Sequence, residues 1–342
     1  MIILLTILGI ALLIFAHEFG HFICAKAFGV RVDEFGIGFP PRLFSVTRGE
    51  TRYSVNLFPL GGFVRLHGET ARESEALSDP RSFIAQPAWK RLVVIAAGVA
   101  MNVVLGWFVV STVLFIGTPR GLLIDRVLPD SAATEAGLFA GDFITGFTEG
   151  SAFTGYIRAH VGEAITINVV REGKRVAISA IPRAANAGGG ILGVVVAEAG
   201  AAPLPLFVAL REGFVQSAIM MASVVVGLWS ILVSLFTQGK LLEGFVGPVG
   251  IFSVAQQTGS LGLAFLLQLI GAISLNLAVL NIMPFPALDG GRLLFLVFEK
   301  IKGSRLSPRF EMVANATGFA LLLMLILAVT LRDVAQLFRP LA

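Results

Sequence analysis

The chain has 342 residues, of which 56% are hydrophobic and 14% charged, and its mean hydropathy is +0.85. This is the composition of an α-helical membrane protein, which implies the lipid bilayer as a partner. The net charge is only +4 and no basic run occurs, so we expect no nucleic-acid partner. The single cysteine, Cys24, excludes an internal disulfide.

The first apolar segment, residues 2–25, is expected to be an uncleaved membrane span. Residues 1–14 carry no charged side chain. A secretory signal peptide begins with basic residues, which this segment lacks. Cleavage after Ala16 would also remove the helix that carries the motif described next.

Three ionisable side chains lie close together near the end of this segment, in His17-Glu18-Phe19-Gly20-His21. Two histidines four residues apart share one face of a helix and can bind one Zn²⁺, with the glutamate placed to take a proton from water. Scattered surface residues are the alternative, but ionisable groups at membrane depth usually mark a functional site. We therefore expect a zinc site.

A catalytic zinc usually has three protein ligands, so this motif lacks one. Cys24 shares the helical face but lies about 10 Å along the axis from His17, which is too far for its short side chain. A better candidate is Asp289, which follows the apolar residues 261–283 within the Pro/Gly-rich stretch 284–291. The alternative interpretation of Asp289 is a helix cap at the membrane surface.

Residues 26–91 form a polar region with ten Lys and Arg residues, which the positive-inside rule places in the cytoplasm. Within it, residues 35–64 are apolar, prone to β-structure and interrupted by glycine, as in the strands of a hairpin. Non-helical backbone at membrane depth must be covered by protein or line a cavity, so we expect a re-entrant β-loop that folds back toward the metal. A small cytoplasmic sheet is the alternative.

Residues 92–116 are a second expected span, which contains Asn102. This asparagine either bonds a neighbouring helix or faces the metal site, and the sequence does not decide between the two. The following residues, 118–200, are typical of a soluble α+β domain. Its expected elements are strands at 121–127 and 165–171 and a short capped helix within 131–138.

Hydropathy and chemistry disagree over the later apolar stretches. Residues 214–236, 261–283 and about 312–331 would each pass as a span. Asp289 reaches the depth of His17 only if 261–283 begins outside the cytoplasm, which requires that 214–236 does not cross. We therefore expect four spans, with 214–236 as an interfacial helix.

The chain resembles the site-2 protease family of intramembrane zinc metalloproteases, and within it the bacterial regulator-of-sigma-E type. The resemblance rests on residues 17–21 in a first span and on the stretch Asn281–Gly290, and it covers essentially the whole chain. Residues 121–142 resemble a PDZ domain. Gly98-Val99 departs from the Gly-Pro that the family usually has before the asparagine of the second span.

The resemblance implies a role for each residue of the site. It makes His17, His21 and Asp289 the ligands of one zinc ion and Glu18 the catalytic carboxylate. The substrate-binding residues that it implies are Asn276, Asn281, Gly36 and Gly38. Its implied activity is hydrolysis within transmembrane segments of single-span membrane proteins, such as an anti-sigma factor or signal-peptide remnants, in the bacterial inner membrane. The PDZ-like domain would lie outside the cytoplasm and either bind a substrate C-terminus or extended peptide or filter substrates by size.

The expected fold is a multi-pass α-helical membrane protein with four spans, an interfacial helix, a re-entrant β-loop and an inserted PDZ-like α+β domain. The expected domains are an N-terminal membrane core at 1–117, the PDZ-like domain at 118–200, an interfacial helix and linker at 201–260, and a C-terminal membrane core at 261–342. Two other classes of function use the same residues: a metal transporter or sensor without hydrolysis, and a membrane-anchored PDZ scaffold with an inactive metal site.

Overall fold

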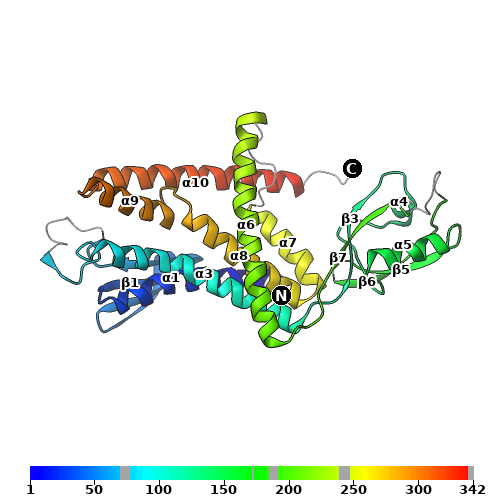
Figure 1. The fold of residues 1–342 in the computed structure, drawn as a ribbon, viewed down its shortest axis with the longest axis horizontal. Helices are drawn as coiled ribbons and strands as arrows, with labels where there is room; N and C mark the ends of the chain where they lie inside the picture. Colours follow the sequence, from blue (N-terminus) through cyan, green and yellow to red (C-terminus); the bar gives the residue numbers. More distant parts are fainter. Residues whose placement is uncertain (70–77, 172, 185–191, 239–246, 338–342) are drawn as a thin grey trace. The chain divides into compact units, whose positions relative to one another are not determined.

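The computed structural model describes residues 1–69, 78–171, 173–184, 192–238 and 247–337 (Figure 1). The chain divides into two compact units. Unit 1 consists of Met1–Ile3, Val110–Gly213 and Phe252–Leu269, and unit 2 of Leu4–Val109, Phe214–Ile251 and Ile270–Ala342. Part of the linker expected within 201–260 lies at 239–246, outside the described residues.

Long apolar helices dominate the chain, as its composition predicts. Those long and apolar enough to cross a membrane are α1 (Ile2–Ala27), α3 (Ala88–Ile116), α6 (Leu206–Gln238), α8 (Leu263–Ile282) and α10 (Pro308–Leu337). Only 11% of the apolar window of α1 and 6% of that of α6 is buried inside the protein, so these helices present apolar side chains that a bilayer would cover. The chain is a multi-pass helical membrane protein with additional β-structure.

Three helices were not predicted from the sequence, α5 (Gly150–Ala159), α7 (Pro248–Leu261) and α9 (Asp289–Lys302). Helix α9 begins directly after the Pro/Gly-rich stretch, with Leu288 as its extended N-cap residue. It ends at Gly303, which has a left-handed φ of 72° and donates its N–H to the Glu299 carbonyl. The basic stretch after residue 300 is therefore partly helical.

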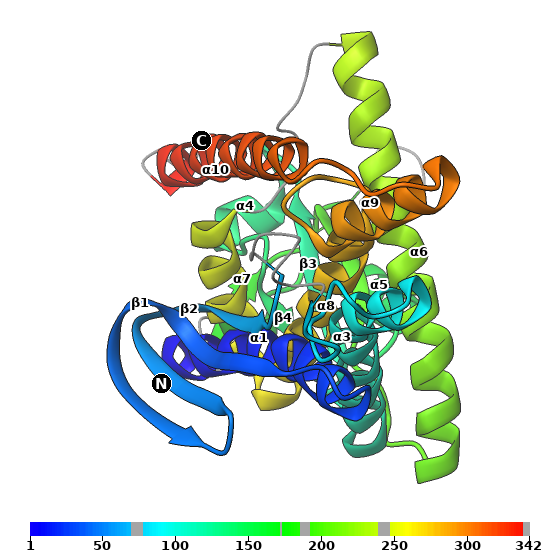
Figure 2. The same ribbon diagram turned by 90° about the vertical axis from the view of Figure 1, so that its left-hand side faces the viewer.

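The β-prone residues form a hairpin of β1 (Val32–Arg48) and β2 (Thr51–Leu66), which confirms the strands expected within 35–64. Residues 35–37 pair with 53–55 on one side and with 62–64 on the other, so β2 folds around β1 and residues 62–64 form an edge. The hairpin curves beside α1 (Figure 2). The ring of Phe35 packs between Phe15 and Phe22 of α1, at centroid distances of 5.7 and 5.2 Å.

Unit 1 contains a five-stranded antiparallel sheet in the order β6-β5-β4-β3-β7. Its strands are β3 (Gly121–Val127), β4 (Phe143–Ile144), β5 (Ile165–Arg171), β6 (Lys174–Ala180) and β7 (Val194–Ala199), and its helices are α4 (Ala132–Ala136) and α5 (Gly150–Ala159). The strands expected at 121–127 and 165–171 are confirmed. So is the capped helix, because the Ser131 hydroxyl accepts the Thr134 N–H at its start and Gly137 ends it.

Candidate metal centre

Helix α1 places the two histidines of the motif on one face. The Nε2 atoms of His17 and His21 lie 3.2 Å apart, and the rings meet edge to face. This is the arrangement that a spacing of four residues produces in a regular helix. Both side chains are mostly buried, with 12% and 9% of their surface exposed. The two nitrogens therefore converge on one point away from bulk solvent.

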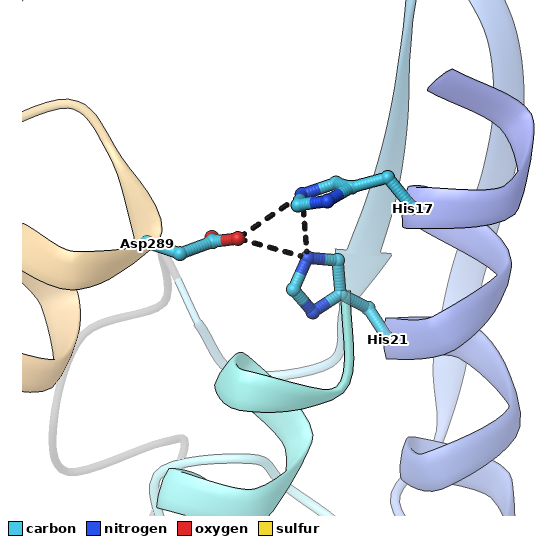
Figure 3. Close-up of side chains that lie close together, drawn as sticks. All are labelled: His17, His21 and Asp289. Carbon is cyan, nitrogen blue, oxygen red and sulfur yellow. Dashed lines mark hydrogen bonds and ion pairs between the residues drawn. The ribbon is translucent and has the colours of Figure 1, made fainter. Parts of the chain in front are cut away.

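The third group comes from the start of α9, on the opposite side of that point (Figure 3). Asp289 Oδ2 lies 3.0 Å from His17 Nε2 and 3.3 Å from His21 Nε2. Two glycines allow the chain to turn so sharply here. A Cβ atom on Gly290 would lie 2.1 Å from the Met283 carbonyl oxygen, and one on Gly291 would lie 2.3 Å from that of Phe285.

These three residues have the donor set of a catalytic zinc site. Their ligand atoms all lie within 4.8 Å of one another, and two imidazoles with one carboxylate is a known zinc combination. A carboxyl group binds zinc in its ionised form, so Asp289 would hold the metal as a carboxylate.

Helix α3 packs against both imidazole rings and hydrogen-bonds to His21. The Nδ1 atom of His21 lies 2.8 Å from the Val94 carbonyl oxygen, which can only accept, so this nitrogen carries the proton and Nε2 keeps its lone pair. A Cβ atom on Gly98 would lie 2.3 Å from His21 Nε2 and 2.9 Å from His17 Cε1. Only glycine lets both rings pack this closely on α3.

Glu18 lies beside the ligands in a cavity of about 180 Å³ within unit 2. The edge residues 62–64 of the hairpin also line this cavity. A Cβ atom on Gly62 would lie 2.9 Å from Glu18 Cγ, so the strand backbone passes directly against the glutamate side chain. The arrangement places an ionisable carboxylate, a β-strand edge and the three converging ligand atoms around one space.

Arg292 also lines this cavity, one turn after Asp289. Its guanidinium forms an ion pair with Glu69 and lies 4.0 Å from Asp289 Oδ1. The sequence analysis missed Arg292, together with Val94, Gly98 and Gly62. None of these residues has a spacing or composition signal of its own. Gly62 lies inside the expected β-loop and Gly98 belongs to the pair compared with the family's Gly-Pro, but neither observation assigns the residue to the metal site.

The four residues expected to bind substrate do not line this cavity, although Gly36 pairs with Phe63, which does. Among the described residues that line the cavity, none is Asn276, Asn281, Gly36 or Gly38. Asn276 is exposed and Asn281 half-buried, both on α8. The two glycines shape the hairpin, since a Cβ on Gly36 would lie 2.4 Å from the Phe63 ring and Gly38 has φ +82°.

Two imidazoles and a carboxylate around one point, beside a glutamate and between apolar helices, fit the active site of a membrane metallopeptidase. The model of peptidase family M50 matches residues 5–325. The chain belongs to peptidase family M50, which makes it a zinc metallopeptidase of the site-2 protease type that acts within the membrane. This confirms the resemblance seen in the sequence, and the metal is Zn²⁺.

Individual relatives with zinc metalloprotease names align with this chain over nearly their whole length. A protein from Nostoc sp. that bears a zinc metalloprotease name is 32% identical over 354 residues, covering 98% of this chain and 97% of its own. Zinc metalloprotease RasP from Geobacillus kaustophilus is 28% identical over 415 residues, covering 95% and 96%. RasP from Bacillus licheniformis is 26% identical over 413 residues, covering 95% and 97%.

Proposed function

We propose that the chain hydrolyses peptide bonds within the transmembrane segments of single-span membrane proteins, with His17, His21 and Asp289 as zinc ligands and Glu18 as the catalytic carboxylate. The observation that carries this proposal is the convergence of the three ligand atoms within 4.8 Å. The substrate class is a bacterial inner-membrane protein, such as an anti-sigma factor or a signal-peptide remnant.

The roles of the residues follow from their positions. When bound, zinc supplies a Lewis acid that polarises the scissile carbonyl and makes water more acidic. Glu18 lines the same cavity, so it takes the proton of the attacking water and passes it to the leaving amine. Val94 holds the ring of His21 so that its Nε2 faces the ligand cluster. Arg292 adds positive charge beside the two carboxylates.

A transmembrane substrate must unwind before it can react, because its carbonyls are hydrogen-bonded within a helix. The edge at residues 62–64 supports binding of the unwound segment as an added strand. Gly36 and Gly38 serve this step by shaping the hairpin, which we propose re-enters the membrane. Asn276 and Asn281 on α8 would bind freed backbone groups of the substrate as it approaches the cavity.

The direct test is the Glu18→Gln variant with a model single-span substrate. We expect it to keep zinc and lose cleavage. A metal transporter or sensor would instead show zinc flux into liposomes that is indifferent to Glu18. A membrane-anchored scaffold with an inactive site would contain no zinc. Full cleavage by Glu18→Gln would refute the proposed mechanism.

We also propose that residues 118–200 are a PDZ-like domain on the extracytoplasmic side, inserted between the membrane cores 1–117 and 261–342. The five-stranded antiparallel sheet with helices α4 and α5 supports this assignment. PDZ domains bind chain ends or extended peptides by strand addition. The domain would therefore select substrates by size or by an exposed C-terminus.

The proposed topology has four spans, with 214–236 as an interfacial helix within the segment 201–260. In unit 2, the part of α6 after residue 213 runs across the direction of α1 and α10 in both views (Figures 1 and 2). This crosswise orientation supports a helix that does not cross the membrane alongside the other spans. The N-terminus then lies outside, and the basic residues after α9 lie in the cytoplasm.

A further inference from the structure

Asn102 is a fully buried polar residue on α3, and its side chain points at the candidate metal centre. Its exposed fraction is 0%, and its Nδ2 lies 3.3 Å from His17 Nδ1. Its Oδ1 is buried and has no hydrogen-bond partner among the described residues. A buried amide oxygen without a partner costs about 1–3 kcal/mol, so this arrangement needs an explanation.

The orientation of the amide decides which tautomer His17 adopts. The oxygen and nitrogen of an asparagine amide occupy nearly the same positions, so they are assigned from their partners. If Nδ2 donates to Nδ1 of neutral His17, the ring proton sits on Nε2 and blocks the atom that faces Asp289. If the amide is turned, Oδ1 accepts the Nδ1 proton, and the lone pair of Nε2 points toward Asp289 and His21.

With the amide turned so that Oδ1 accepts, Asn102 would bind His17 in the same way that the Val94 carbonyl of α3 binds His21. Val94 accepts the Nδ1 proton of His21 at 2.8 Å, and Gly98 makes room for both rings. Positions 94, 98 and 102 are four residues apart, so they lie on one face of α3, one turn after another. With the Asn102 amide turned, this face of α3 would present one hydrogen-bond acceptor to Nδ1 of each histidine, with Gly98 between the two acceptors.

The side chain of Asn102 does not make the hydrogen bond that links α3 to α8. The bond between α3 and α8 is made by the main chain of Asn102, whose carbonyl accepts the Ser274 hydroxyl at 2.8 Å. Ser274 is fully buried as well. The side-chain amide is therefore not needed for this link between the helices, and a variant at Ser274 provides a matched control.

We propose that Asn102 is a positioning residue for the zinc ligand His17, whose Nδ1 proton it accepts through Oδ1. This fixes the tautomer that presents Nε2 to the metal. The proposal rests on the ligand set of the proposed function. Partners of metal-bound histidines commonly act this way, and their loss lowers metal affinity about 10- to 100-fold.

The test measures zinc affinity of the purified full chain by competition with a chromophoric chelator, together with the thermal stability of the metal-free protein. Asn102→Leu removes the acceptor at similar volume and should lower zinc affinity about 10- to 100-fold. Asn102→Asp retains an acceptor and should bind zinc within a few-fold of the parent, as expected for a carboxylate–histidine–zinc arrangement. Ser274→Ala should lower stability and leave zinc affinity unchanged.

Three results would overturn the proposal. They are parental zinc affinity in Asn102→Leu, equal losses in Asn102→Asp and Asn102→Leu, and an equal loss in Ser274→Ala. If Asn102→Leu does not fold, Asn102→Ala takes its place with the same expected loss. Failure of the ligand set itself is recognised separately, because His17→Ala would then bind zinc like the parent.

Discussion

Asp289 Oδ2 lies 3.0 Å from His17 Nε2, although the two residues come from opposite ends of the sequence. The contact joins the start of α9 to α1 and closes the group of ligand atoms. Neither segment contains the complete donor set. The candidate metal centre therefore depends on how α9 packs against α1 in unit 2.

Replacing Asp289 should remove the metal without unfolding the chain. Asp289→Asn removes the charged ligand, and we expect zinc affinity to fall by more than about 100-fold. Loss of a residue that only hydrogen-bonds to a zinc ligand already lowers metal affinity about 10- to 100-fold, and loss of a ligand itself should lower it further. Chelator competition measures the change. Asp125→Asn is the matched control, since Asp125 is exposed on β3. Full zinc occupancy in Asp289→Asn would contradict the assigned ligand.

Gly62 should be required for catalysis and not for metal binding. Its missing side chain leaves room for Glu18, because a Cβ atom would lie 2.9 Å from Glu18 Cγ and 3.2 Å from the Gly36 carbonyl oxygen. We expect Gly62→Ala to displace Glu18 and lower kcat about 10- to 100-fold, with zinc content unchanged.

Gly155→Ala provides the control for this experiment, because a Cβ atom on Gly155 of α5 meets no atom within 4 Å. It should keep parental activity. Parental activity in Gly62→Ala would mean that the hairpin edge does not position Glu18.

Deletion of residues 120–198 should relax substrate selection and leave the chemistry intact. The sheet β3–β7 lies in unit 1, whereas the ligands, Glu18 and the cavity all lie in unit 2. Cleavage of a series of substrates with extracytoplasmic domains of increasing size measures the selection. We expect the deletion variant to accept larger domains. Complete loss of cleavage by a well-folded deletion variant would argue against a filter.

The side of the membrane on which positions 240 and 302 lie distinguishes four spans from five. Single cysteines at positions 240 and 302, in a background with Cys24→Ala, can be labelled with a membrane-impermeant maleimide. The four-span topology predicts that position 240 reacts from outside and position 302 only from the cytoplasm. The reverse pattern would mean that 214–236 crosses the membrane and that Asp289 cannot reach His17.

The sequence predicted the parts of the fold and site that have local signals. His17, Glu18 and His21 share one helical turn, and Asp289 stands out as a carboxylate in a Pro/Gly-rich break. The strands at 121–127 and 165–171 were recognisable from apolar and β-branched residues bounded by turn residues. These patterns each lie within one short stretch.

The residues that support the site were harder to predict for a physical reason. Helix α3 is apolar around most of its circumference, so its sequence does not indicate which side faces α1. The sequence therefore does not decide between the two roles of Asn102, and it does not indicate that Val94 and Gly98 face the histidines. The contact of Gly62 with Glu18 likewise depends on how β2 folds around β1, which alternation alone does not specify.

The measurement that tests the central claim most directly is cleavage-site mapping of a single-span substrate by mass spectrometry, with the parent chain and Glu18→Gln compared at equal zinc content. Glu163→Gln, which changes an exposed glutamate in unit 1, serves as the control. We predict that the parent and Glu163→Gln cut within the transmembrane segment, and that Glu18→Gln binds zinc but cleaves at least about 100-fold more slowly. Cleavage outside the transmembrane segment, or parental cleavage by zinc-loaded Glu18→Gln, would contradict the account.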